Sequence, residues 1–346
     1  MNTVLNALNS ALKKAMESDQ RVILIGEDLL DPYGGAFKVT RGLSIAFPDR
    51  VLATPISEAG IVGVATGMAM RGLRPVVEIM FGDFVTLVAD QVINHAAKFS
   101  WMYNEQVKVP LVIRTPMGGR RGYGPTHSQS LEKHFLGVPG LRVLAPSSLG
   151  DPGKLLLQAI HSEEVVLFVE NKLLYAVNIK EPAALPDFEI RQSDGDTYEM
   201  GSVNASPSYT LTIKGAPRPV LTLATYGYMA ELAIEAAFRL AFDHEIFIEL
   251  VVLTQLAPFR LEPVLTSVGK TGRLLAAEEG NHALGWGAEV IAQAAETLGS
   301  QLRKADRLGA LNLPIPSSSA LEQTVLPSTN ALIHKAIHMV KGSNYD

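Results

Sequence analysis

The 346-residue chain has no cysteine, little charge and no long apolar run. Without cysteine it has no disulfides, no thiolate nucleophile and no cysteine-ligated zinc. Its net charge of −5 and the lack of a strongly basic segment exclude a dedicated nucleic-acid-binding protein. No apolar run approaches the roughly 18 residues of a membrane span, and Lys13 and Lys14 interrupt the start where a signal peptide would be apolar. We therefore expect a cytoplasmic protein without a membrane segment.

Apolar residues make up 47% of the sequence, and the length suits two domains. The expected strands are continuous apolar runs, which is typical of parallel strands covered by helices on both faces. These strands are 22–26, 50–55, 75–80, 109–115, 141–146 and 165–170, then 209–213, 220–224, 246–253 and 274–278. The expected helices are 2–18, 60–70, 84–99, 151–161, 229–242, 284–297 and 330–340.

This alternation predicts an α/β fold of two domains, each a mainly parallel sheet flanked by helices. Prolines and a polar run interrupt the pattern after residue 180. The domains are expected at 1–185 and 201–346, with a linker at 186–200.

Several familiar site patterns are missing: a Walker A loop, a His-Glu-x-x-His helix and a Gly-x-Ser-x-Gly elbow. Two patterns resemble metal sites only in part. The Asp-Gly pattern at 193–196 is expected to be a turn in the linker. His334 and His338 share one helix face but lack a third ligand, which favours a surface pair.

Glu58 lies at the carboxyl end of an expected strand, just before the helix expected at 60–70. Ligands of open α/β sheets bind outside the carboxyl ends of the strands, so Glu58 is a candidate site residue. It could equally be a helix-start glutamate that complements the helix dipole. Phe81 and Phe84 flank Gly82 at the end of the next strand. They could stack on a planar ring or simply fill the core.

The segment 118–129 is unusually rich in glycine and contains Arg120 and Arg121. Thr126 and Gln129 have the spacing of a capping box, which places His127 at the first position of a helix. There the dipole favours a neutral imidazole, suited to acid–base chemistry. A surface loop with a hydrogen-bonded histidine remains the alternative.

In order and spacing, these segments resemble the β subunit of heterotetrameric, thiamine-diphosphate-dependent 2-oxo acid dehydrogenases, the E1 component. This transketolase-like resemblance covers nearly the whole chain, with a pyrimidine-binding domain followed by a transketolase C-terminal-like domain. It rests on Gly26-Glu27-Asp28, Thr54-Pro55-Ile56-Ser57-Glu58, Ala89-Asp90-Gln91, Arg114-Thr115-Pro116, His127-Ser128-Gln129, Pro139-Gly140-Leu141 and Ala277-Glu278-Glu279.

The resemblance implies roles for three residues. Glu58 matches the glutamate that hydrogen-bonds N1′ of the cofactor's aminopyrimidine and promotes the imino tautomer, whose nitrogen removes the thiazolium C2 proton. Phe84 matches the aromatic residue that packs on the aminopyrimidine. His127 matches the histidine near the reactive carbon, which assists proton or acyl transfer. Magnesium and the diphosphate belong to the α partner, so we expect an α2β2 assembly and no turnover by this chain alone.

The resemblance also implies a potassium site built from carbonyls near Leu111, Ala159, Ser162 and Glu164. Arg120 and Arg121 depart from the family pattern and could pair with an acidic substrate or with the α partner.

The leading functional hypothesis is oxidative decarboxylation of pyruvate or a branched-chain 2-oxo acid, with acyl transfer to a lipoyl-E2. The alternatives are an acetoin dehydrogenase β subunit, a transketolase-like acyloin or acyl-transfer subunit of a specialised pathway, and a non-catalytic interaction subunit. The presence of Glu58 and His127 argues against the last.

Overall fold

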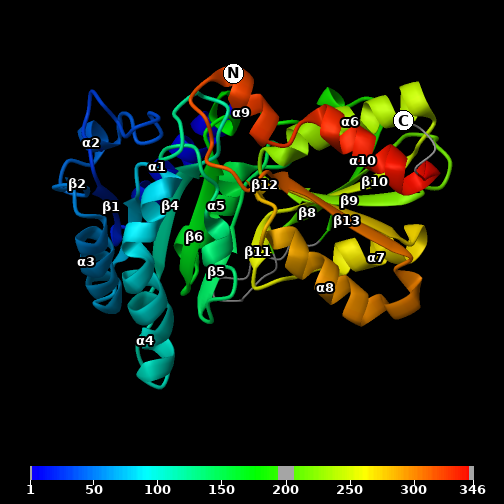
Figure 1. Cartoon of the computed structure of the whole chain (residues 1–346). Coiled ribbons are helices and arrows are strands. Elements are labelled where there is room, and N and C mark those ends of the chain that lie inside the picture. The colour runs from blue at the N-terminus through cyan, green and yellow to red at the C-terminus, as the bar shows by residue number, and fades with distance from the viewer. Residues whose placement is uncertain (1, 194–205, 343–346) are drawn as a thin grey trace.

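The computed structural model describes residues 2–193 and 206–342. Within these residues, seven strands form a first sheet and six form a second (Figure 1). The first sheet has the order β11-β5-β6-β4-β3-β1-β2 and the second the order β13-β12-β9-β10-β8-β7. The two sheets with their covering helices confirm the predicted α/β fold.

The first sheet is parallel except at one edge. Its parallel strands are β1 (Val22–Gly26), β2 (Val51–Ala53), β3 (Arg74–Glu78), β4 (Leu111–Met117), β5 (Leu141–Leu144) and β6 (Val165–Asn171). The antiparallel edge strand β11 (Gln255–Ala257) comes from the second half of the chain and pairs with β5. Its three residues join the two domains through one sheet.

Helices cover both faces of this sheet. On one face, α1 (Val4–Ser18) and α5 (Pro152–His161) bury apolar stripes that include Leu8, Leu12 and Leu156. On the other lie α3 (Glu58–Met70), the 3₁₀ helix η1 (Gly82–Val88), the π-helix η2 (Gln91–Ala96) and α4 (Ala97–Met102). The short helix α2 (Leu43–Ala46) precedes β2, and the 3₁₀ turns η3 (Glu132–His134), η4 (Leu174–Ala176) and η5 (Pro182–Ala184) complete this half.

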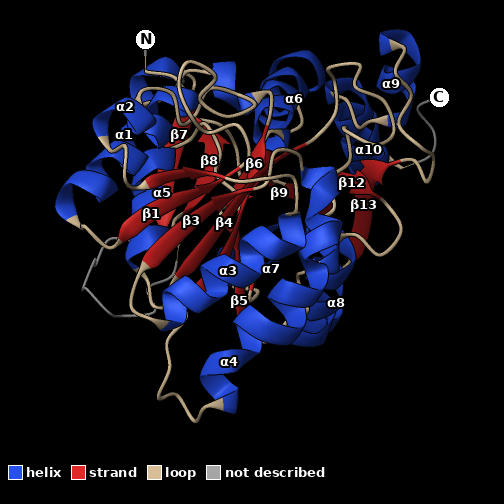
Figure 2. Cartoon of the chain, turned by 90° about the vertical axis from the view of Figure 1, so that its left-hand side faces the viewer, coloured by secondary structure: helices blue, strands red, loops and turns tan. Residues whose placement is uncertain are grey.

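The second sheet contains β7 (Phe188–Ser193), β8 (Ser208–Ile213), β9 (Leu221–Tyr226), β10 (Ile248–Leu253), β12 (Arg273–Asn281) and β13 (Lys304–Ala310). One face carries α6 (Met229–His244) and α10 (Thr329–Lys341), and the other carries α7 (Glu262–Thr271) and α8 (Trp286–Leu298) (Figures 1 and 2). The 3₁₀ turn η6 (Gly299–Gln301) follows α8, and α9 (Ser319–Val325) precedes α10.

The structure differs from the sequence prediction at particular elements. The single helix expected at 84–99 is broken into η1, η2 and α4. Gly82 permits the tight start of η1, because a Cβ there would lie 2.1 Å from Cγ of Met117. The range 186–200, expected as a linker, contains β7, which pairs antiparallel with β8. The Asp-Gly motif at 194–196 lies outside the described residues.

Candidate active site

The candidate site residues lie at the carboxyl edge of the first sheet. Glu58 follows β2, Phe84 lies in η1 after β3, and His127 lies in the loop after β4. These strands are neighbours in the order β4-β3-β1-β2, so the loops that follow them meet at one edge. Glu27, directly after β1, joins the group between them.

Glu58 is the first residue of α3, which begins two residues before the helix expected at 60–70, and it is 8% exposed. Glu27 is also buried, and its Oε1 has no hydrogen-bond partner within the described residues. Burial raises the pKa of Glu27, and the charge of Glu58 raises it further. In the sequence, Glu27 stands out only as part of the Gly26-Glu27-Asp28 motif. Its position directly after a buried strand was the signal that could have identified it.

An aromatic cluster surrounds His127. Its ring centroid lies 4.8 Å from that of Phe81 and 5.3 Å from that of Phe84, both in edge-to-face geometry. Tyr123 and Phe37 extend the cluster at 6.0 and 5.5 Å from Phe81. Phe81 and Phe84 are half-buried, so they form a partly open aromatic wall beside the histidine.

The prediction of a helix that begins at His127 is wrong, because residues 127–130 form a bend and an irregular loop. Thr126 Oγ1 lies 3.1 Å from His127 Nδ1, and Gln129 donates its side-chain amide to Asp83 Oδ1 at 2.8 Å. The capping-box residues therefore bond to a neighbouring ring and to η1. The helix-dipole argument for a neutral imidazole no longer applies.

Lys172 lies beneath this loop and is fully buried. Its Nζ donates to the backbone carbonyl of His127 at 2.6 Å and lies 5.2 Å from the Phe81 ring centroid. Burial lowers the pKa of Lys172 to about 8, although the charges of Asp83 and Glu279 act in the opposite direction. Lys172 could not be identified from the sequence, because its partner lies 45 residues away.

A second buried charge group lies further along the same edge. Arg114 forms a bidentate pair with Glu170 at 2.8 Å and donates to Glu78 at 2.9 Å. Tyr175 donates its hydroxyl to Glu170 at 2.5 Å. Arg114 is 2% exposed and Glu170 1% exposed, so the guanidinium charge of Arg114 is paired with carboxylates inside the protein.

The two loop arginines have different environments. The Arg120 side chain donates to the carbonyl of Pro327 at 2.5 Å and lies 3.9 Å from Glu279. The exposed Arg121 lies over the rings of Phe37 and Tyr123, at 5.8 and 5.7 Å. Only Arg121 therefore remains available for an anionic group outside the chain.

The carbonyls expected to bind potassium are largely occupied by donors of this chain. Ala159 accepts both the backbone N–H and the hydroxyl of Ser162, and Glu164 accepts from Leu111. Arg74 Nη1 donates to the carbonyl of Ser162 at 2.7 Å and to that of Ile160 at 3.1 Å. A guanidinium at these carbonyls repels a second cation, so the residues do not fit a potassium ion.

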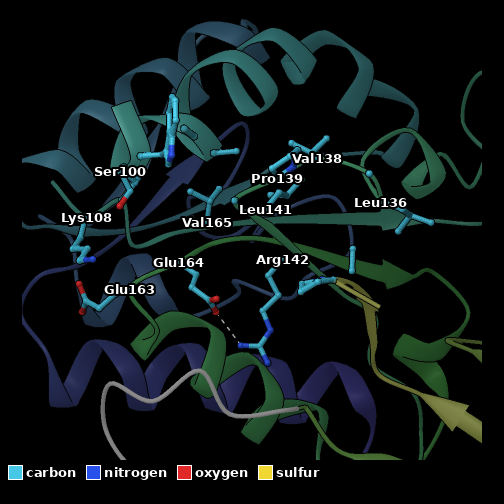
Figure 3. A pocket seen from close by; sticks show the side chains of 18 of the residues that line it. Ser100, Lys108, Leu136, Val138, Pro139, Leu141, Arg142, Glu163, Glu164 and Val165 are labelled. Atoms are coloured by element: carbon cyan, nitrogen blue, oxygen red, sulfur yellow. Dashed lines mark hydrogen bonds and ion pairs between the residues drawn. The ribbon is translucent and has the colours of Figure 1, made fainter. Parts of the chain in front are cut away.

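A cavity of about 820 Å³ lies at the opposite, amino end of β4, β5 and β6 (Figure 3). It is lined mainly by apolar residues that include Leu136, Val138 and Leu141. Arg142 there is paired with Glu164 at 3.0 Å. None of the residues proposed for chemistry lines this cavity.

His334 and His338 are exposed on α10. In residues 2–193 and 206–342, no group of three or more His, Asp or Glu side chains is arranged to hold a metal ion. No helix in the same ranges combines the length and apolar character of a membrane span.

Comparison with known proteins yields two matching family models. Residues 2–177 match the transketolase pyrimidine-binding domain, and residues 213–332 match the transketolase C-terminal domain. A solved structure titled as a split-gene transketolase, an inactive β4 tetramer, superposes with a TM-score of 0.73 at 18% identity, covering 99% of both chains. That likeness shows the fold.

Curated relatives match along nearly the whole length. The mitochondrial pyruvate dehydrogenase E1 subunit β-1 of Arabidopsis thaliana is 35% identical over 96% of this chain and 87% of its own. The pyruvate dehydrogenase E1 subunit β of Rickettsia conorii is 34% identical, covering 96% of both. The β subunit of acetoin:2,6-dichlorophenolindophenol oxidoreductase from Cupriavidus necator is 33% identical, over 98% of this chain and 97% of its own. The chain therefore belongs to the transketolase-like family of dehydrogenase β subunits that includes these proteins.

Proposed function

We propose that this chain is the β subunit of an α2β2 2-oxo acid dehydrogenase E1. The reaction is oxidative decarboxylation of pyruvate or a branched-chain 2-oxo acid, with transfer of the acyl group to a lipoyl-E2. The observation that carries the proposal is the convergence of Glu58, Phe84 and His127 at one sheet edge, in a chain with full-length pyruvate dehydrogenase β relatives.

The residues at this edge fit thiamine diphosphate, with Mg²⁺ held by the α partner. Phe84 and Phe81 offer aromatic rings, set edge to face at 69°, and Glu58 offers a buried carboxylate for a ring nitrogen. Oδ2 of Asp83 is buried without a partner in the described part of the chain. When bound, this cofactor supplies an electron sink for cleaving the bond between the carbonyl carbon and the carboxylate.

Glu58, Phe84 and His127 each have a separate role in this proposal. Glu58 shares a proton with the aminopyrimidine ring and orients it. Phe84 packs against that ring and excludes water. His127 holds a proton at its imidazole nitrogen on the substrate side, where proton or acyl transfer takes place.

An exposed apolar surface beside Glu58 supports the need for a partner chain. Ile56 is 83% exposed, Val64 58% and Leu87 55%, and these residues lie just before α3, in α3 and in η1. Gly60 and Gly67 on α3 are exposed too, so another backbone could approach closely. We propose that the α partner covers this surface and completes the site.

Acetoin cleavage is the second candidate, because the acetoin oxidoreductase relative matches over 98% of this chain. The two functions differ in the substrate that the assembled enzyme accepts. If the assembled enzyme turns over acetoin and no 2-oxo acid, acetoin cleavage replaces 2-oxo acid decarboxylation as the proposed function.

The deciding experiment compares the purified chain with the co-expressed αβ pair. We expect 2-oxo acid turnover only from the pair, and only with thiamine diphosphate and a divalent metal. The mass of the pair in solution should correspond to α2β2. Turnover by the isolated chain, unchanged when the partner is added, would refute the proposal.

His127→Ala tests the proposed division of roles. Exchange of the C2 proton of bound thiamine diphosphate should stay near normal, while acyl transfer falls by about 10²–10⁴-fold. His334→Ala is the matched control, because it removes an exposed imidazole on α10, outside the proposed site. Full acyl transfer by the His127 variant would make the histidine a structural loop residue.

A further inference from the structure

The loop that leads to His127 is attached to the second domain through its backbone. Gly119 donates its N–H to Glu279 at 2.7 Å, and Arg120 donates its N–H to Glu322 at 2.7 Å. Gly122 donates to the other oxygen of Glu322 at 3.2 Å. Glu279 lies near the end of β12 and Glu322 lies in α9, and both acceptors are more than 150 residues away in the sequence.

The hydrogen bond to Glu279 is buried, the two to Glu322 are partly buried, and all three have a carboxylate as acceptor. Glu322 is 2% exposed, and both of its carboxylate oxygens accept loop N–H groups. Removing such an acceptor leaves two donors without partners, and that costs more than an ordinary surface hydrogen bond is worth. The loop therefore has a strong preference for its place against α9.

The backbone conformation of the loop depends on this attachment. Arg120 has a φ of 67°, in the left-handed region that side chains other than glycine rarely adopt. Its guanidinium reaches across to Pro327 and Glu279. Such a conformation persists where the surroundings hold it, so freeing Arg120 would let the loop relax.

The other end of the loop is fixed within the first domain. Lys172 donates to the His127 carbonyl, and Gln129 donates to Asp83. The segment from Gly119 to His127 is thus held at one end by α9 and β12 and at the other by β6 and η1. Before this segment, Gly118 follows β4 and donates its N–H to the carbonyl of Gln129 at 3.3 Å. Loss of the second-domain contacts would therefore free the middle of the loop, between two anchors in the first domain.

We propose that Glu322, together with Glu279, is a positioning residue for His127: the second domain holds the loop in the conformation that presents the imidazole to the reacting groups. This inference rests on the proposed function, since it assigns His127 to the acyl-transfer step. It gives α9 and the end of β12 a role in the active site, although neither belongs to the first domain.

The test uses Glu322→Ala and Glu322→Gln in the co-expressed αβ assembly. Glu249→Gln is the matched control, because Glu249 is an equally buried second-domain carboxylate that binds Arg191 and Lys270, away from the loop. Trypsin cleaves after Arg120 and Arg121, so it reports directly on release of the loop. We expect cleavage there to be about tenfold faster in Glu322→Ala than in the wild type, and unchanged in the control.

Activity provides the second readout. Acyl transfer by Glu322→Ala should fall about tenfold or more, while C2-proton exchange of the bound cofactor stays within about twofold. Glu322→Gln keeps one acceptor oxygen and should be intermediate in both cleavage and turnover. A general folding defect would lower exchange and acyl transfer together, and that result would overturn the proposal.

The remaining outcomes are also decisive. A loop that stays resistant to trypsin in Glu322→Ala, or a freed loop with unchanged acyl transfer, refutes the positioning role and leaves the proposed function standing. If the wild-type assembly turns over no 2-oxo acid, the proposed function fails, and with it the link between this loop and that reaction. Faster cleavage would then still confirm that Glu322 holds the loop.

Discussion

Two groups of buried carboxylates lie along the carboxyl edge of the first sheet, and they differ in one respect. Glu78 and Glu170 share the guanidinium of Arg114, whereas in the described part of the chain no Lys or Arg pairs with Glu27 or Glu58. A buried carboxylate with a bound cation contributes to a fixed structure. One without a cation is available to share a proton with a ligand, and its burial points to a functional site.

Removing the cation from the paired group should have the largest effect. Arg114→Met leaves Glu78 and Glu170 buried without a counter-charge, so the free energy of unfolding should fall by about 3–5 kcal/mol. Urea denaturation measures the loss. Adding Glu78→Gln and Glu170→Gln to this variant should recover part of it. A loss below about 1 kcal/mol would mean that the carboxylates do not depend on Arg114.

Substitution of a carboxylate in the unpaired group should lower activity and leave stability nearly unchanged. Glu58→Gln should lower kcat by about 10²-fold or more and slow C2-proton exchange of bound thiamine diphosphate, with little change in unfolding free energy. In the proposed assembly the α partner holds the diphosphate, so the cofactor should still bind. Exchange at the wild-type rate would remove Glu58 from the mechanism.

A third buried ionic group extends the comparison to the amino end of the same sheet. Arg74 donates to two carbonyls at the end of α5, forms an ion pair with Glu163 and lies 3.6 Å from Asp19. Arg74→Met should lower the unfolding free energy by about 1–3 kcal/mol.

At equal ionic strength, the wild-type unfolding midpoint should be the same in potassium and choline chloride. A saturable stabilisation by potassium would contradict the assignment of these carbonyls to Arg74.

The smallest effect concerns Glu27. Its pKa is raised in the folded chain by burial and by Glu58, so its contribution to stability is present at low pH and is lost as pH rises through that pKa. Glu27→Gln should therefore match the wild type near pH 4 and exceed it by up to about 1 kcal/mol near pH 8. Thermal unfolding across this range provides the measurement. A variant less stable than the wild type at pH 8 would show that the Glu27 charge is favourable.

The sequence predicted well those features that depend on neighbouring residues. Continuous apolar runs such as 22–26 and 165–170 are strands in the structure, and Glu58 begins a helix. The strand β11 was missed because three residues carry no periodicity and the partner strand lies more than 100 residues away. The polar composition of β13, with Lys304, Asp306 and Arg307, concealed another strand.

The candidate site could be predicted only as far as local patterns reach. Glu58, Phe84 and His127 follow strands and match a family motif, so they could be named. Lys172, Glu279 and Glu322 act through contacts with residues 45 to 202 positions away, which no local pattern contains. The capping-box pattern at Thr126 misled for the same reason, because Asp83, 46 positions earlier, takes the Gln129 amide.

The edge strand β11 sets an order of events during synthesis. Residues 255–257 close the β5 edge of the first sheet, yet they are made after all the other strands of that sheet. Until they leave the ribosome, the nascent first domain presents an open row of backbone N–H and C=O groups along β5. That edge is a place where two unfinished chains could pair, and a chaperone bound there would have to leave before the first sheet is complete.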